Sequence, residues 1–357
     1  MCPRPATAMP DEFSGPRRFQ DSPADDASLT VETHQAAPGG LSRVDGSRDR
    51  FDNRIMNLAG DNNRESARIE YLREGYLRRP GFFADEIALL AALIDRDKRR
   101  LLEREDVTID SQGGEASNLG YLGHGDDVIT SFAATARLVN LVSELLADQV
   151  YLLKGRLNIK WGDDARAKRG GWDPHQDRAA WAKEGLPGGA ALTAAIAIDA
   201  CDADNGTLEI IPGSHAGGVL EHRAIACGFG ISEEIVRPIL ERSRRMPLEM
   251  AAGDMVIFSG DLIHLSKQNL GSRRRALLFL TFNAVGNCPA QGVGPSRYQC
   301  KGPLGARDDQ VLAGLARDFR AGRYTPQLDW DAIQHEREID IAEDIDSGWT
   351  DLTPTLR

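Results

Sequence analysis

The hydrophobic pattern of the chain changes twice along its length. Residues 1–65 are rich in Pro, Gly, Asp, Arg and Ser and carry few large apolar side chains, so they cannot bury enough surface to fold alone. Between residues 83 and 149 the apolar residues recur at helical spacing, and from residue 150 they form short runs. This order predicts a disordered arm over 1–65, then helices, then strands.

Two helices are predicted before the strands. The first begins near residues 83–85, and its apolar stripe is Ile87, Leu90, Ala91 and Ile94. The second is expected as one helix within residues 126–149, with Asp126 or Asp127 as its N-cap.

The later apolar runs have the length of strands and are separated by Gly, Asp, Asn and Pro. They occupy residues 150–162, 191–199, 207–213, 254–260 and 276–283. We expect a helix at 231–245, broken or kinked at Pro238, and a late helix at 308–322. The series predicts a mainly β jelly roll, a double-stranded β-helix with flanking helices, over residues 66–330. An acidic tail at 331–357 follows.

Composition narrows the possible partners. The net charge of -11 argues against nucleic acid or an anionic membrane as the main partner, because both require a basic surface. There is no signal-peptide pattern and no apolar run long enough to span a membrane, so we expect a cytoplasmic protein. The scattered cysteines are interpreted as free thiols in a reducing compartment: Cys2, Cys201, Cys227, Cys288 and Cys300.

The stretch "WDPHQD" at residues 172–177 is a candidate metal-binding motif. On a strand, His175 and Asp177 would face the same side while Gln176 faces away. Such a pair occurs often by chance, and a facial metal triad needs a third ligand from a distant segment. His264 is the best candidate, because it ends a strand and turn; the others lie in the arm, the tail or turns: His34, His124, His215, His222 and His335.

Three arginines, residues 273–275, open the strand that follows His264. A 2-oxo acid that chelates a metal through its keto and C1 carboxylate oxygens needs a cation to hold its far carboxylate, and arginine can do so in bidentate fashion. A His and Asp pair that could bind a metal, a distant histidine and an arginine, all in this order, are much less probable by chance than any one of these features alone.

These motifs together resemble the phytanoyl-CoA dioxygenase family of iron(II)- and 2-oxoglutarate-dependent oxygenases. The matching stretches are "HQD" at 175–177, "NGTLEIIPGSH" at 205–215 and "HLSKQN" at 264–269 with the arginine cluster. Within the family the pattern is most similar to ectoine hydroxylases. The resemblance implies Fe(II), 2-oxoglutarate and O2 as cofactor and co-substrates. It also implies hydroxylation, or another oxidation, of a small molecule such as an amino-acid derivative or specialised metabolite, with release of succinate and CO2.

The resemblance also implies roles for individual residues. His175, Asp177 and His264 become the iron ligands. Arg275 becomes the 2-oxoglutarate arginine, with Arg274 or Arg273 as alternatives in other registers. The remaining 2-oxoglutarate candidates are Ser266, Asn158 and, more weakly, Lys154.

The substrate pocket is expected to include Trp172, Trp181 and Arg178. Arg178 would either recognise an acidic substrate or form a structural ion pair, and Trp181 would either wall the pocket or pack in the core. The run Arg178, Ala179, Ala180 replaces the aromatic and polar run of ectoine hydroxylases, which argues against ectoine as the substrate. Two alternatives stay open: a non-catalytic jelly roll that binds a metabolite or partner, and a cupin-like metalloenzyme that does not use 2-oxoglutarate.

Overall fold

A computed structural model describes residues 65–104, 106–111, 114–121, 127–162, 169–183, 185–225, 228–289 and 301–334. Nearly all of the predicted arm over 1–65 and of the predicted tail over 331–357 lies outside these ranges, as do His34, His124 and His335.

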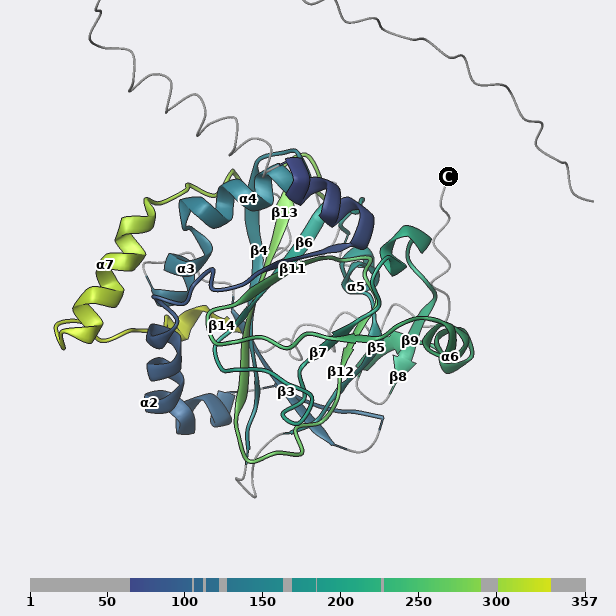
Figure 1. The fold of residues 1–357 in the computed structure, drawn as a ribbon, viewed down its shortest axis with the longest axis horizontal. Helices are drawn as coiled ribbons and strands as arrows, with labels where there is room; N and C mark the ends of the chain where they lie inside the picture. The colour runs from purple at the N-terminus through teal and green to yellow at the C-terminus, as the bar shows by residue number, and fades with distance from the viewer. Residues whose placement is uncertain are drawn as a thin grey trace, which may run out of the picture. The chain divides into compact units, whose positions relative to one another are not determined.

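Two antiparallel sheets form the framework of the described residues (Figure 1). The larger sheet has the strand order β1 (Tyr76–Arg79), β11 (Met255–Ser259), β6 (Ala191–Ala197), β13 (Arg275–Ala284), β4 (Val150–Lys160), β3 (Glu115–Tyr121) and β14 (Ile333–Gln334), and β2 (Asp106–Ile109) also pairs with β3. The smaller sheet has the order β10 (Met246–Pro247), β7 (Leu208–Ile210), β12 (His264–Ser266) and β5 (Trp172–His175). A hairpin of β8 (His222–Ile225) and β9 (Gly228–Ile231) is separate. The predicted double-stranded β-helix is confirmed.

Side chains of the larger sheet alternate between two environments, as the two-residue period of a strand requires. One side packs against four helices, α2 (Ala88–Arg104), α3 (Val128–Ala133), α4 (Ala136–Leu146) and α7 (Asp309–Arg320) (Figure 1). Alternate residues of β6 and β13, among them Ile196, Leu278 and Phe282, belong to this outer core. The intervening residues Ala195, Ala197 and Leu277 pack with the smaller sheet instead.

The region predicted as one long helix is two helices. Asp127 caps α3, because its side chain accepts a hydrogen bond from the Thr130 backbone N–H at 2.7 Å. The helix then stops, since Thr135 has an extended backbone and pairs with Arg307 in a β-bridge. Hydrogen bonds to and from Arg307 replace helical ones at Ala134 and Ala136. The pairing with Arg307 therefore interrupts the helix, although the apolar pattern of the sequence continues through this region.

Three further predictions need correction or completion. Of the two outcomes predicted at Pro238, a break or a kink, the break is absent, because Pro238 lies inside the continuous helix α6 (Glu233–Arg242). Strands β2 and β3 and the short helix α5 (Asp177–Lys183) were not predicted. Cys201 is a free, buried thiol as expected, but Cys288 is disulfide-bonded, so the expectation of free thiols throughout was wrong.

No helix among the described residues is long and apolar enough to cross a membrane.

Candidate metal centre

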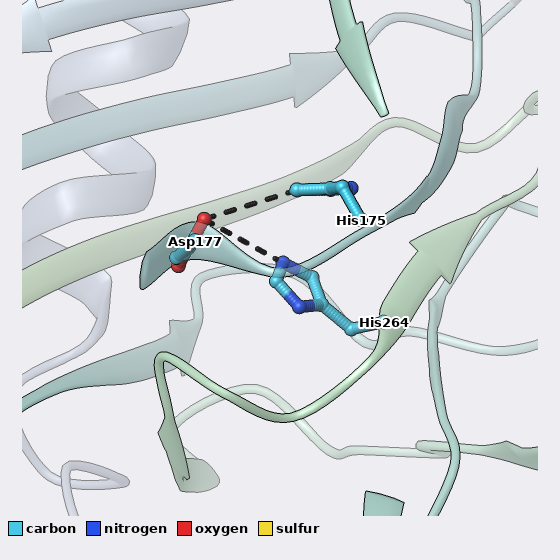
Figure 2. Close-up of side chains that lie close together, drawn as sticks. All are labelled: His175, Asp177 and His264. Carbon is cyan, nitrogen blue, oxygen red and sulfur yellow. Dashed lines mark ion pairs between the residues drawn. The ribbon is translucent and has the colours of Figure 1, made fainter. Parts of the chain in front are cut away.

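Two segments far apart in the sequence, residues 172–177 and the start of β12, bring His175, Asp177 and His264 together (Figure 2). His175 ends β5, and His264 begins β12, which pairs antiparallel with β5 so that the two histidines are direct cross-strand partners. Their ring centroids are 4.1 Å apart. Cross-strand pairing therefore positions the two imidazoles side by side.

Asp177 reaches the same point by a different route from the one predicted. The sequence suggested that His175 and Asp177 share one face of a strand, but β5 ends at His175, and Asp177 is the first residue of α5. The turn from strand into helix, rather than strand alternation, directs the carboxylate toward the imidazoles. The two side chains do lie together, as predicted, but the predicted reason, a shared strand face, was wrong.

The three side chains present a compact donor set. Asp177 Oδ1 lies 3.8 Å from Nε2 of His175 and 3.8 Å from Nε2 of His264 (Figure 2). One donor atom from each residue can be chosen so that all three lie within 4.8 Å of one another. Two imidazoles and one carboxylate are the donor set typical of non-haem iron(II) sites with open coordination positions, so these residues fit such an ion.

Backbone carbonyls orient both imidazoles. Nδ1 of His175 lies 2.7 Å from the carbonyl oxygen of Asp173, and Nδ1 of His264 lies 3.0 Å from that of Leu262. A carbonyl only accepts, so each Nδ1 carries a proton, and in the neutral form of each ring the lone pair is on Nε2. Both lone pairs are therefore available on the nitrogens nearest Asp177.

Electrostatics keeps the centre in the protonation state that binds a cation. Burial, reinforced by the neighbouring His264, lowers the pKa of His175 to about 3, so its imidazole is neutral at pH 7. Burial would raise the pKa of Asp177, but His264, His175, Arg156 and Lys154 outweigh it and hold that pKa below its usual value. The neutral imidazole of His175 beside an ionised carboxylate suits a divalent cation.

Gln176, between the two ligand candidates, fixes the strand-to-helix turn. Its side chain is fully buried and donates to the carbonyls of Gly218 at 2.8 Å and Asp261 at 2.6 Å, while its oxygen accepts from the Leu220 N–H at 2.8 Å. Its backbone N–H donates to Nε2 of His222 at 2.9 Å. Gln176 thus faces away from the triad, as predicted, and His222 has a role that the sequence did not reveal.

A cavity connects the triad to Arg275. Its lining combines the triad with polar residues of β4 and apolar residues of both sheets: Asn118, Arg156, Asn158, Trp172, His175, Asp177, Thr193, Leu208, Phe258, His264, Leu265, Ser266, Arg275, Leu277, Phe279 and Thr281. The candidate metal ligands and the 2-oxoglutarate candidates Asn158, Ser266 and Arg275 therefore line one cavity.

Arg275 lies at the end of this cavity and is almost completely buried. Its Nη1 donates to Oδ1 of Asn158 at 2.6 Å, and its Nε donates to the carbonyl of Gly206 at 3.2 Å. Burial lowers its pKa to about 10, which still leaves the guanidinium charged at pH 7. No carboxylate of the described residues forms an ion pair with it, so a buried cation faces the cavity without an anionic partner there.

The neighbouring arginines differ from Arg275. Arg273 pairs with Asp202 at the surface, and Arg274 pairs with Asp199 at 2.8 Å and with Asp95 at 2.5 Å. Neither lines the cavity. Of the three registers left open by the sequence, only the one that selects Arg275 places a guanidinium in the lining of the cavity that the triad also lines.

The predicted lysine at residue 154 belongs to a larger polar row. Residues 154, 156, 158 and 160 alternate along β4, which pairs with the cavity-lining residues of β13. Sequence reasoning chose Lys154 and Asn158 but missed Arg156 and Lys160. The signal was present as "KGRLNIK", in which every second residue is polar inside an otherwise apolar strand.

The structure separates the three predicted pocket residues. Trp172 lines the cavity. Trp181 is 2% exposed and packs with Tyr151 and Leu153 in a core cluster outside the lining. Arg178 pairs with Asp261 at 2.8 Å, because α5 points its side chain toward the β11–β12 turn and away from the cavity. For Trp181 the structure therefore shows core packing. For Arg178 it shows the structural ion pair.

The fold and this site define a class, the double-stranded β-helix dioxygenases that depend on iron(II) and 2-oxoglutarate. The model of the family described as phytanoyl-CoA dioxygenase matches residues 71–277. The chain belongs to this family. It is an enzyme that uses iron(II), 2-oxoglutarate and O2, which excludes the non-catalytic and 2-oxoglutarate-independent alternatives.

Individual relatives agree with this assignment. An L-proline trans-4-hydroxylase of Streptomyces griseoviridis is 28% identical over 246 residues, covering 64% of this chain and 90% of the relative. An ectoine dioxygenase of Sphingopyxis alaskensis is 29% identical over 231 residues, covering 60% and 74%. The crystal structure of EctD from S. alaskensis with bound Fe matches with a TM-score of 0.54 and 25% identity, covering 68% of this chain and 86% of that one.

Proposed function

We propose that this enzyme hydroxylates a small anionic molecule, with His175, Asp177 and His264 as its iron ligands and Arg275 as the anchor of 2-oxoglutarate. The observation that carries the proposal is the single cavity, which has a His, Asp, His donor set at one place and a buried arginine without a carboxylate partner among the described residues at another. A dicarboxylate with one chelating end fits between them.

The residues around the cavity have separate tasks. The triad binds the metal, which supplies the oxidising chemistry when 2-oxoglutarate and O2 are also present. Arg275 and Ser266 orient the distal carboxylate of 2-oxoglutarate, and Leu208, Phe258 and other apolar lining residues exclude water. One oxygen atom of O2 enters the substrate as a hydroxyl group, and the other enters succinate as 2-oxoglutarate loses CO2.

The charge of the cavity supports an anionic substrate. Among the lining residues that the structure describes, Asp177 is the only carboxylate, whereas Arg156 and Arg275 are both cations. Arg156 is near enough to Asp177 to lower its pKa. We therefore assign Arg156, rather than Arg178, to a carboxylate or another anionic group of the substrate. Two relatives are named for L-proline and ectoine, small molecules that each carry a carboxylate, which is consistent with this class.

Anaerobic titration tests the metal and 2-oxoglutarate assignments. Iron(II) and 2-oxoglutarate added together should give a weak visible charge-transfer band, and Arg275→Met should raise the 2-oxoglutarate concentration required for it about tenfold or more. Arg273→Met is the matched control, because that arginine pairs with Asp202 outside the cavity. Loss of the band in the control, or an unchanged band in Arg275→Met, would contradict the assignment.

A succinate-release screen tests the substrate class. Small amino acids and cyclic amino-acid derivatives should be compared with their uncharged amides, and we expect turnover only where the anionic group is present. Arg156→Leu should raise the KM of an accepted substrate about tenfold to a hundredfold, while the Michaelis constant for the co-substrate 2-oxoglutarate stays near its original value. Equal turnover of acid and amide would refute the anionic class.

A further inference from the structure

Lys160, the last residue of β4, is buried with no evident role in the metal triad. It is 2% exposed, and its ammonium donates to Oγ of Ser266 at 2.8 Å, to the carbonyl of Gly206 at 3.3 Å and to the carbonyl of Lys267. Lysine is rarely buried so completely, because removing its charge from water is costly. Such a residue calls for a functional explanation.

Lys160 lies directly opposite Arg275 in the register of β4 and β13. Burial, and secondly the charge of Arg275, lower the pKa of Lys160 well below its usual value. Neither residue forms an ion pair with a carboxylate in the part of the chain that the structure describes. Two adjacent cations repel one another, so a bound anion would relieve the repulsion.

The direction of the hydrogen bonds connects Lys160 to the cavity. In its ammonium form Lys160 has no lone pair; the carbonyls of Gly206 and Lys267 take two of its three N–H groups, and Ser266 Oγ accepts the third. The serine's own hydrogen then points elsewhere, and Ser266 lines the cavity together with Arg275. Accepting a bond from a cation also polarises the hydroxyl and makes it a better donor. Lys160 therefore turns Ser266 into a donor directed at the cavity.

The same ammonium steadies the environment of Arg275. The carbonyl of Gly206 accepts from Lys160 Nζ and from Arg275 Nε, so one backbone oxygen is shared by both cations. Lys160 also binds the backbone that follows β12 through Lys267. It thereby links β4, the end of β12 and the turn before β7 at the cationic end of the cavity.

We propose that Lys160 is a positioning residue for the co-substrate, acting through the Ser266 hydroxyl to favour 2-oxo acids that carry a second carboxylate. This inference rests on the proposed function, in which Arg275 and Ser266 receive the distal carboxylate of 2-oxoglutarate. The effect should be confined to that carboxylate, because Lys160 has no contact with the triad among its described hydrogen bonds.

The test compares two ligands in the iron-loaded enzyme under anaerobic conditions. Lys160→Met should weaken the binding of 2-oxoglutarate about tenfold to a hundredfold in Kd, the range expected when a charge-assisted network is lost. The binding of 2-oxobutyrate, which has no distal carboxylate, should change less than about threefold, and so should iron affinity. Equal weakening of both 2-oxo acids would indicate general damage and overturn the inference.

A double-variant cycle tests whether Ser266 is the intermediary. If Lys160 acts through the hydroxyl, Lys160→Met combined with Ser266→Ala should weaken 2-oxoglutarate binding little more than the worse single variant does. Fully additive effects would show that Lys160 acts independently and overturn the proposal. Should Lys160→Met fail to fold, as judged by circular dichroism, Lys160→Gln gives the same comparison.

Two controls separate this inference from the proposed function. Lys98→Met changes a lysine on α2, whose ammonium lies over the Trp161 ring on the helix side, and should leave both affinities unchanged. Arg275→Met tests the co-substrate site itself. If Arg275→Met leaves 2-oxoglutarate binding intact, the proposed function fails; if it weakens binding and Lys160→Met does not, only the role of Lys160 fails.

Discussion

The two faces of the larger sheet use the same strands for opposite purposes. The outer face of β6 and β13 is apolar and packs against α2, α3, α4 and α7. The inner face of β4 and β13 carries Arg156, Asn158, Lys160 and Arg275, of which all but Arg156 are nearly completely buried. Burial on the outer face stabilises the fold, whereas burial of charge on the inner face opposes it. Substitutions on the outer face should therefore mainly change the free energy of unfolding. Substitutions on the inner face should mainly change the binding of metal and co-substrate.

The largest expected effect is on the inner side, at the triad. His264→Ala removes one of three donors held within 4.8 Å, so substrate-dependent succinate release should fall at least about a thousandfold. The thermal unfolding midpoint of the iron-free protein should change by only a few degrees. Activity within tenfold of the original would show that His264 is not a ligand.

On the outer face, Leu278→Ala should have the next largest effect, and it should be on folding. Leu278 is fully buried in the helix-facing core, and a truncation of this kind costs about 2–5 kcal/mol. Urea unfolding should report the loss, while the folded enzyme keeps its affinity for 2-oxoglutarate. A large change in that affinity would break the proposed division between the faces.

A smaller effect is expected at Gln176, which lies between two of the proposed iron ligands, His175 and Asp177, and fixes the turn between them. Gln176→Ala removes the bonds to the carbonyls of Gly218 and Asp261, so iron affinity should fall about tenfold to a hundredfold. Competition with a chelator measures this, and Gln268→Ala, which breaks only a bond to Asp110, serves as the control. Equal affinities in the two variants would assign Gln176 to folding alone.

The smallest effect concerns Cys201, a buried thiol in the cluster between the two sheets. Burial raises its pKa to about 12, so the reactive thiolate is scarce at pH 8. Iodoacetamide should leave Cys201 unmodified in the folded enzyme and alkylate it in guanidinium chloride, as peptide mass spectrometry would show. Rapid alkylation of the native protein would mean that this layer opens to solvent.

Local sequence patterns were sufficient to predict some elements of the fold but not others. The apolar period of α2 and the strand-length runs of β4, β6, β11 and β13 were readable, because one buried face imposes its period on the residues. The break at Thr135 was not readable, since it depends on pairing with Arg307. Strands β2 and β3 were missed because no clear apolar run marks them.

The site shows the same division. The sequence by itself determined the chemical types and their order: a His and Asp pair, a later histidine, then an arginine cluster. Only the tertiary structure decided that Asp177 enters from a helix, that Arg275 rather than Arg273 or Arg274 faces the cavity, and that Lys160 supports Ser266. The physical reason is that burial and hydrogen-bond direction depend on partners from other strands, and spacing along one chain does not specify those partners.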